Sequence, residues 1–272
     1  MRYAILALDL DGTLTNSKKK ITPLTKQRVL EARRAGVQIV LASGRPELGI
    51  RPLARELDFY RSGGYILSNN GSRILDCKTN EALFERTVPA ELYAHICEFA
   101  RAEGLSALAY DDHGVLSENP EDEYVKKEAF NNGIPIRRVP LLEQAVSWPV
   151  NKFMIVGPPP RLQAALPTLK KNIGRKVNIF LSEPYFMEIS PPEIEKAYAM
   201  QQLLALLGLN KSQLAFCGDG LNDLTLMRLA GLGIAMGNAC EEIKSASGFI
   251  TRSNEEDGVA YAIERFILPY AE

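Results

Sequence analysis

The chain has 272 residues, of which 46% are hydrophobic and 24% charged, and its formal net charge is −1. This length allows one large domain or two modest ones with an ample core, and the composition is ordinary for a globular enzyme. The charge balance excludes the strongly basic surface that attracts nucleic acid or anionic membranes, so we expect neither as a partner.

The first predicted strand covers residues 3–8 and runs into the segment Asp9–Leu14, which reads DLDGTL. Side chains two apart in a strand point to the same side, so Asp9 and Asp11 should be neighbours, and Gly12 lets the chain turn away. Two carboxylates at the mouth of a buried strand are costly unless a cation or a proton offsets their charge. The alternative is a plain strand followed by an Asp-Gly turn.

The following segments alternate between helix and strand. Thr22 and Pro23 predict the start of a helix that ends at Gly36. An apolar run over 37–42 predicts a buried parallel strand, and a helix to about residue 58 and a strand over 64–68 follow it. This rhythm indicates an α/β fold with a doubly wound parallel sheet.

The regular alternation of strand and helix ends after residue 73 and begins again after residue 187. Between them the patterns predict a hairpin over 74–84, helices over 90–103 and 162–173, and strands over 105–110, 151–156 and 177–181. The polar stretch 117–148 has no clear pattern. We therefore expect residues 84–186 to form an inserted α+β cap domain, and residues 1–83 and 187–272 to form the parallel-sheet core.

The loops that follow the predicted parallel strands carry polar residues: Asp9 and Asp11, Ser43 and Gly44, Asn70, and Asp219, Asn222 and Asp223. In an open α/β sheet these loops gather at the carboxyl edge, where ligands bind. The carboxylate excess suits Mg2+, which prefers oxygen ligands. Ser43 and Gly44, next to a predicted helix start, and Lys196 supply donors and charge for a phosphate. The predicted reaction is phosphoryl transfer to a carboxylate, followed by hydrolysis.

The cysteines show no CxxC spacing: Cys77, Cys97, Cys217 and Cys240. This argues against a zinc site or a disulfide framework and favours a reducing compartment. Asp9 and Asp11 interrupt the N-terminal apolar stretch, which is too short for a signal peptide, and no segment approaches the roughly 18 apolar residues of a membrane span. We expect a cytoplasmic protein; no feature of the sequence indicates an oligomeric state.

Together these motifs resemble the haloacid dehalogenase superfamily of phosphohydrolases. The matching pieces are the DLDGTL segment, Ser43, Lys196 and the segment Gly218–Asp223, which reads GDGLND. The large insertion, with the segments SNNG at 68–71, SEPYFMEI at 182–189 and SNEEDGVA at 253–260, is similar to the Cof-type branch, which includes bacterial sugar phosphatases. Ala197 departs from the pattern, because the family usually has glycine after the lysine.

The resemblance implies a role for each matching residue. Asp9 would be the nucleophile that forms an aspartyl-phosphate, and Asp11 would protonate the leaving alcohol and then activate water. The implied Mg2+ ligands are Asp9, the backbone carbonyl of Asp11 and Asp219, with Asp223 or Gly220 close by. The implied phosphate ligands are Ser43, Gly44, Lys196, Asn222 and the Leu10 amide.

The sequence thus predicts an Mg2+-dependent phosphatase acting on small phosphate monoesters, with sugar phosphates favoured. A phosphomutase or phosphotransferase would use the same aspartyl-phosphate, and a non-catalytic regulator that binds a phosphorylated metabolite would use the same fold. Other site residues also have purely structural interpretations: Asp219 and Asp223 as a Gly-Asp-Gly turn with a helix cap, Ser43 as a helix cap, Lys196 as a solvated lysine and Asn70 as an Asn-Gly turn.

Overall fold

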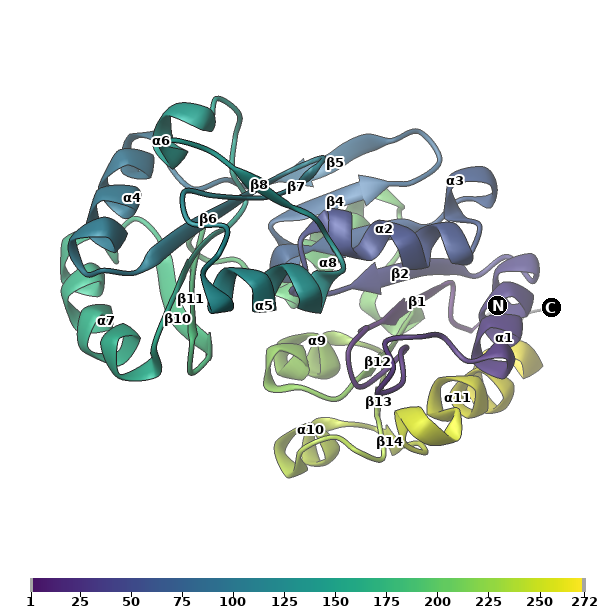
Figure 1. Cartoon of the computed structure of the whole chain (residues 1–272). Helices are drawn as coiled ribbons and strands as arrows, with labels where there is room; N and C mark the ends of the chain where they lie inside the picture. Colours follow the sequence, from purple (N-terminus) through teal and green to yellow (C-terminus); the bar gives the residue numbers. More distant parts are fainter. Residues whose placement is uncertain (1, 271–272) are drawn as a thin grey trace. The chain divides into compact units, whose positions relative to one another are not determined.

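The computed structural model describes residues 2–270 and divides into two compact units (Figure 1). Unit 1 comprises the described chain up to Phe84 and from Glu195 onward, and unit 2 is the stretch Glu85–Ile194. Each unit has its own sheet and its own hydrophobic core. In the described part of the chain, no helix is both long enough and apolar enough to cross a membrane.

Unit 1 is built on a sheet with the strand order β14-β13-β12-β1-β2-β3-β4-β5. Its strands are β1 (Ile5–Leu8), β2 (Gln38–Ala42), β3 (Tyr65–Ser68), β4 (Arg73–Asp76), β5 (Glu81–Glu85), β12 (Leu214–Gly218), β13 (Leu232–Ala235) and β14 (Phe249–Ile250). The pairs from β14 to β3 are parallel, and β4 returns antiparallel to β3. The doubly wound parallel core that the sequence predicts is therefore confirmed.

The helices of unit 1 connect these strands: α1 (Pro23–Arg34), α2 (Glu47–Glu56), α3 (Phe59–Ser62), α8 (Lys196–Leu206), α9 (Leu224–Leu229), α10 (Glu241–Ala246) and α11 (Gly258–Phe266). Thr22 caps α1 by accepting the Thr25 amide, and Pro23 is its first residue, as the sequence predicts. The helices α1 and α11 lie side by side (Figure 1). Every residue of β1 and β12 is buried, and the two strands lie side by side in the interior of the sheet.

Unit 2 carries a second sheet, with the order β10-β11-β9-β6-β7-β8. Its strands are β6 (Ser106–Asp111), β7 (Gly114–Ser117), β8 (Ile136–Arg138), β9 (Phe153–Val156), β10 (Asn178–Glu183) and β11 (Phe186–Ser190). Its helices are α4 (Tyr93–Ala102), α5 (Glu123–Asn132), α6 (Leu142–Ala145) and α7 (Pro159–Ile173). Residues of α4, α6 and α7 join those of the sheet in one hydrophobic core.

The structure differs from the predicted insertion in two places. The strand β11 pairs with β10 and β9, so residues 187–190 belong to the sheet of unit 2 and not to the core that the sequence assigns from residue 187. The stretch 117–148 contains α5, β8 and α6. The sequence does not indicate these elements, because each is short and the buried face of α5 includes the polar residues Glu128 and Asn132.

Candidate active site

The end of β1 is shaped by the close approach of the DLDGTL segment to the loop after β12. The Asp9 amide donates to the carbonyl of Cys217 at 3.0 Å, which continues the pairing of the two strands beyond Leu8. Gly12 has φ +81°, and a Cβ at this position would lie 2.2 Å from Oδ2 of Asp219. Glycine is therefore required here both by the backbone angle and by the carboxylate beside it.

Lys196 lies between Asp9, which follows β1, and Asp223, which lies in the loop after β12. It is the first residue of α8, and its side chain is fully buried. Its ammonium lies 2.5 Å from Oδ1 of Asp9 and 2.6 Å from Oδ1 of Asp223. The interpretation of Lys196 as a solvated surface lysine is therefore wrong, because a buried ammonium needs anionic partners and has them here.

The GDGLND loop is held by Asp223. The second oxygen of its buried carboxylate accepts the amides of Asp219 and Gly220, at 3.0 and 3.1 Å. Asp219 in turn accepts the Thr13 hydroxyl at 2.7 Å. Both oxygens of Asp223 are thus used within the protein, while Asp219 directs its Oδ2 towards Gly12.

The carboxylates of Asp9, Asp219 and Asp223 form a cluster in which one ligand atom from each lies within 4.8 Å of the others. Burial and the charge of Asp223 raise the pKa of Asp9 well above its usual value, although Lys196 opposes this shift. Burial also raises the pKa of Asp219 to about 6, against the hydrogen bond from Thr13. One lysine therefore does not balance three carboxylates, and a hard cation fits the oxygen donors and the excess charge.

The side chain of Asp11 does not join this cluster. It takes a bidentate ion pair from Arg45, with Nε and the second guanidinium nitrogen each 2.6 Å from an oxygen, and a further contact from Lys19. Burial raises the pKa of Asp11, but the hydrogen bonds and charges of Arg45 and Lys19 outweigh burial and leave that pKa below its usual value. Asp11 is thus ionised in this arrangement.

Ser43 and Gly44 follow β2 and lie beside the loop after β3. The helix α2 starts at Glu47 with Pro46 at its cap position, so Ser43 does not cap that helix. Instead its buried hydroxyl accepts the Arg45 amide at 3.1 Å. A Cβ on Gly44 would lie 3.1 Å from the amide group of Asn70, which also accepts a hydrogen bond from Nδ2 of Asn222 at 3.1 Å.

The structure therefore gathers the ends of β1, β2, β3 and β12 as the sequence predicts, with the start of α8 beside them. Sequence reasoning did not single out three residues that contact the predicted ones: Thr13, Lys19 and Arg45. Thr13 belongs to the DLDGTL segment, and Arg45 directly follows Ser43 and Gly44. Their positions in these segments therefore indicate that they lie at the site. Lys19 is in the lysine run 18–20, which alone suggests only a solvated loop.

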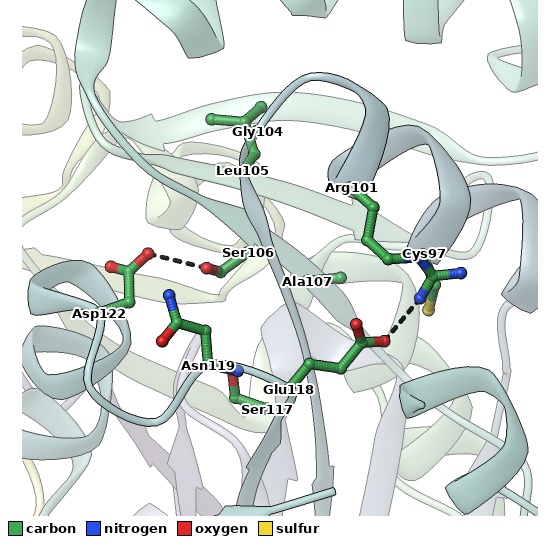
Figure 2. A pocket seen from close by; sticks show the side chains of 10 residues that line it. All are labelled: Cys97, Arg101, Gly104, Leu105, Ser106, Ala107, Ser117, Glu118, Asn119 and Asp122. Atoms are coloured by element: carbon green, nitrogen blue, oxygen red, sulfur yellow. Dashed lines mark hydrogen bonds and ion pairs between the residues drawn. The ribbon is translucent and has the colours of Figure 1, made fainter. Parts of the chain in front are cut away.

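A cavity lies entirely within unit 2 (Figure 2). It has a volume of about 340 Å³ and is lined by residues of α4, β6, β7 and the segment before α5. Its polar groups pair with one another: Ser106 donates to Asp122 at 2.7 Å, and Arg101 contacts Glu118 at 2.6 Å. This mutual pairing leaves the carboxylate cluster of unit 1 as the candidate active site.

Comparisons with known proteins show the family of the chain. The model of the haloacid dehalogenase-like hydrolase family matches residues 6–263. The chain is 30% identical over 267 residues to "Putative phosphatase YxeH" of Bacillus subtilis (strain 168), covering 98% of this chain and 99% of that protein. It is 29% identical over 269 residues to the 5-amino-6-(5-phospho-D-ribitylamino)uracil phosphatase YcsE of the same organism, covering 97% of this chain and 96% of that protein.

A crystal structure of a haloacid dehalogenase-like hydrolase from Bacteroides thetaiotaomicron has a similar fold, with a TM-score of 0.95. The two chains are 43% identical, and the match covers 97% of this chain and 99% of that one. The protein thus belongs to the haloacid dehalogenase-like hydrolase family and is an enzyme, a phosphatase of that family.

Proposed function

We propose that this phosphatase hydrolyses small phosphate monoesters, and sugar or polyol phosphates in particular, with Mg2+ and through a phosphate ester of Asp9. The observation that carries the proposal is the buried ammonium of Lys196 between Asp9 and Asp223, inside a cluster that Asp219 completes. A phosphate dianion needs positive charge at its site, and the cluster supplies a fixed ammonium together with carboxylates that suit a metal ion.

The metal ligands we propose are Asp9, the backbone carbonyl of Asp11 and Asp219. When bound, Mg2+ would offset the negative charge of the carboxylates and of the phosphate. We assign Asp223 to a supporting role, because its two oxygens already accept Lys196 and the amides of Asp219 and Gly220. Gly220 is the remaining candidate beside the ion. The raised pKa values of Asp9 and Asp219 support a cation at this place.

In the first proposed step, an oxygen of Asp9 attacks phosphorus while the bond from phosphorus to the leaving oxygen breaks. Asp11 gives its proton to the leaving alkoxide, so the alcohol leaves neutral. In the second step, Asp11 takes a proton from water as that water attacks phosphorus, and the bond between Asp9 and phosphorus breaks. Lys196 keeps the Asp9 carboxylate oriented, and Ser43, Gly44, Asn222 and the Leu10 amide hold the phosphate oxygens.

The contacts of Asp11 constrain this sequence of steps. Its pairing with Arg45 and Lys19 favours the ionised form, which is the form that accepts a proton from water. To act first as an acid, Asp11 must leave these two cations and carry a proton towards the substrate. We infer that substrate binding releases the Asp11 carboxylate from Arg45.

We assign the choice of substrate to unit 2 (Glu85–Ile194), as the family resemblance implies. The name of the relative YcsE supports a phosphorylated sugar or polyol, because its substrate carries a phosphoribityl group. We place the reaction in the cytoplasm, and the free thiols of Cys77, Cys97, Cys217 and Cys240 support a reducing compartment.

The test is a phosphate-release screen of the purified chain against sugar phosphates, polyol phosphates and nucleotides, with Mg2+ and with EDTA. We expect release from a preferred ester only with Mg2+. The Asp9→Asn variant should lose at least about a thousandfold in rate and form no phosphoenzyme. Asp76→Asn, at the end of β4, should behave as wild type. Activity in EDTA would overturn the metal assignment. Sugar isomers formed without phosphate release would indicate a phosphomutase, and binding without turnover a regulator.

A further inference from the structure

The turn after β3 has an uncommon backbone. Three consecutive residues have positive φ: Asn69 at 48°, Asn70 at 55° and Gly71 at 103°. Residues other than glycine rarely adopt this conformation, and asparagine is one of the few that do so readily. Gly71 is explained by packing, because a Cβ there would lie 2.8 Å from the Glu195 carbonyl oxygen and 2.9 Å from Cβ of Ala199. The turn is therefore wedged against the start of α8, next to Lys196.

Hydrogen bonds fix the same turn to the Ser43 loop. The Asn69 amide donates to the Arg45 carbonyl at 2.9 Å, and the Asn70 amide donates to the Ser43 carbonyl at 3.0 Å. These bonds set the position of the Asn70 backbone relative to the proposed phosphate loop.

The side chain of Asn70 continues towards the opposite loop. Its Oδ1 accepts Nδ2 of Asn222 at 3.1 Å, although 152 positions separate the two residues. The oxygen of Asn222 is turned towards Gly220, since a Cβ on that glycine would lie 2.8 Å from it. Asn222 thus has a defined orientation, with one N–H on Asn70 and a second N–H left to donate.

The Asn70 amide group also lies against Gly44. A Cβ on Gly44 would lie 3.1 Å from both Nδ2 and Oδ1 of Asn70, so the edge of the amide group, with its donor and its acceptor, lies beside the glycine. The primary amide is suited to this place, because it offers an acceptor to Asn222 and donors to an anion without adding charge. Glycine would fit the backbone at lower cost but has no such group, and aspartate would add negative charge beside the carboxylate cluster.

We propose that Asn70 is a phosphate-site residue, which orients the amide of Asn222 and adds its own N–H donors beside Gly44. The proposal rests on the proposed function, since it assigns Asn70 to the same anion site. The structural interpretation of Asn70 as an Asn-Gly turn explains its backbone angles but not the hydrogen bond with Asn222.

The Asn70→Gly variant separates the two interpretations. If the residue serves only the turn, glycine should be tolerated, because it adopts positive φ freely. If the amide binds phosphate, the variant should remain folded and yet lose affinity. The matched control is Asn80→Gly, since Asn80 is exposed and has φ 60° in the turn between β4 and β5. Asn70→Asp keeps the shape of the side chain and its acceptor oxygen, but replaces the NH2 donor group with a negatively charged oxygen.

The measurements are thermal unfolding, the affinity for inorganic phosphate in Mg2+ by calorimetry, and kcat and KM for p-nitrophenyl phosphate. We expect Asn70→Gly and Asn70→Asp to weaken phosphate binding and lower kcat/KM by about tenfold or more, as for a lost hydrogen bond to a charged group. We expect Asn80→Gly to match wild type in both. In an Asn222→Ala background, Asn70→Gly should cost less than it does alone, because part of its effect passes through Asn222.

Wild-type phosphate affinity and kcat/KM in Asn70→Gly would overturn the inference, and so would full additivity with Asn222→Ala. A wild-type chain that binds inorganic phosphate but hydrolyses no ester would overturn the proposed function alone. In that case the calorimetric comparison of Asn70→Gly with Asn80→Gly still decides the role of Asn70.

Discussion

The hydroxyl of Thr13 donates to Oδ1 of Asp219 at 2.7 Å and joins two loops that lie 206 positions apart. This bond connects the segment that carries the proposed nucleophile to the loop that carries a proposed metal ligand. A hydrogen bond of this kind fixes the orientation of a ligating carboxylate and tunes its affinity for the ion.

Thr13→Val should therefore weaken Mg2+ binding by about tenfold, because valine keeps the shape and loses the donor. The measurement is the Mg2+ concentration that gives half of the maximal activity. Thr13→Ser keeps a hydroxyl and serves as the control. An unchanged Mg2+ requirement in Thr13→Val would show that the bond does not support the metal site.

The requirement for Mg2+ should also depend on pH. Burial raises the pKa of Asp219 to about 6 in the metal-free chain, so below that pH the ion must displace a proton from the carboxylate. The apparent Mg2+ affinity should therefore fall as the pH decreases below 6, by up to about tenfold for each unit. Titrations with Mg2+ at pH 5, 6 and 7 measure this, and Thr13→Val should move the transition to higher pH. A flat profile from pH 5 to 7 would contradict the assignment of Asp219.

Asp11→Asn should reduce activity according to the leaving group. An alkyl phosphate needs a proton on its leaving oxygen, so its hydrolysis should fall by about a hundredfold or more. The rate of the first step with p-nitrophenyl phosphate should fall less, because p-nitrophenolate leaves without needing a proton. Burst kinetics separate this step from the attack of water. Equal losses in the first step for both esters would argue against proton donation by Asp11.

Glu128 offers a test of stability in unit 2. It is buried, accepts the Tyr110 hydroxyl at 2.6 Å, and has a pKa raised by burial, against the charge of Lys152. Because the folded chain holds this proton more tightly than the unfolded chain, the contribution of Glu128 to stability is lost as the pH rises through its folded pKa.

Glu128→Gln should therefore raise the melting temperature by about 2–4 °C relative to wild type at pH 8, and by less near pH 4.5. Glutamine keeps an acceptor for Tyr110. Glu123→Gln, an exposed change on the same helix, is the control and should show no such trend. A constant difference between Glu128→Gln and wild type across this range would refute the interpretation.

The sequence predicts the core of this protein well because its parallel strands are continuous apolar runs. The predicted strand over 37–42 matches β2 to within one residue, and a polar loop follows it. The site could be predicted for the same reason, since parallel strands bring their carboxyl ends to one edge. The contacts within the site could not be predicted, because a pattern of residue types does not show which hydrogen-bond partner each side chain has.

Unit 2 was harder to predict, for a physical reason. Its helix α5 carries buried polar residues, Glu128 and Asn132, which hydrogen-bond to each other at 2.8 Å. Such a helix lacks the apolar stripe by which an amphipathic helix is detected. The sequence places the end of the insertion at residue 186, the first residue of β11, because the apolar residues of β11 suit a strand of either sheet.

The central strand β1 pairs with β2 on one side and with β12 on the other. Synthesis from the N-terminus delivers β2 within the first 42 residues, whereas β12 ends at Gly218. All of unit 2 is synthesised in the interval, so β1 cannot pair with β12 before unit 2 has been made. The carboxylate cluster and its buried ammonium therefore form only after the last third of the chain, with Lys196, Asp219 and Asp223, has been synthesised.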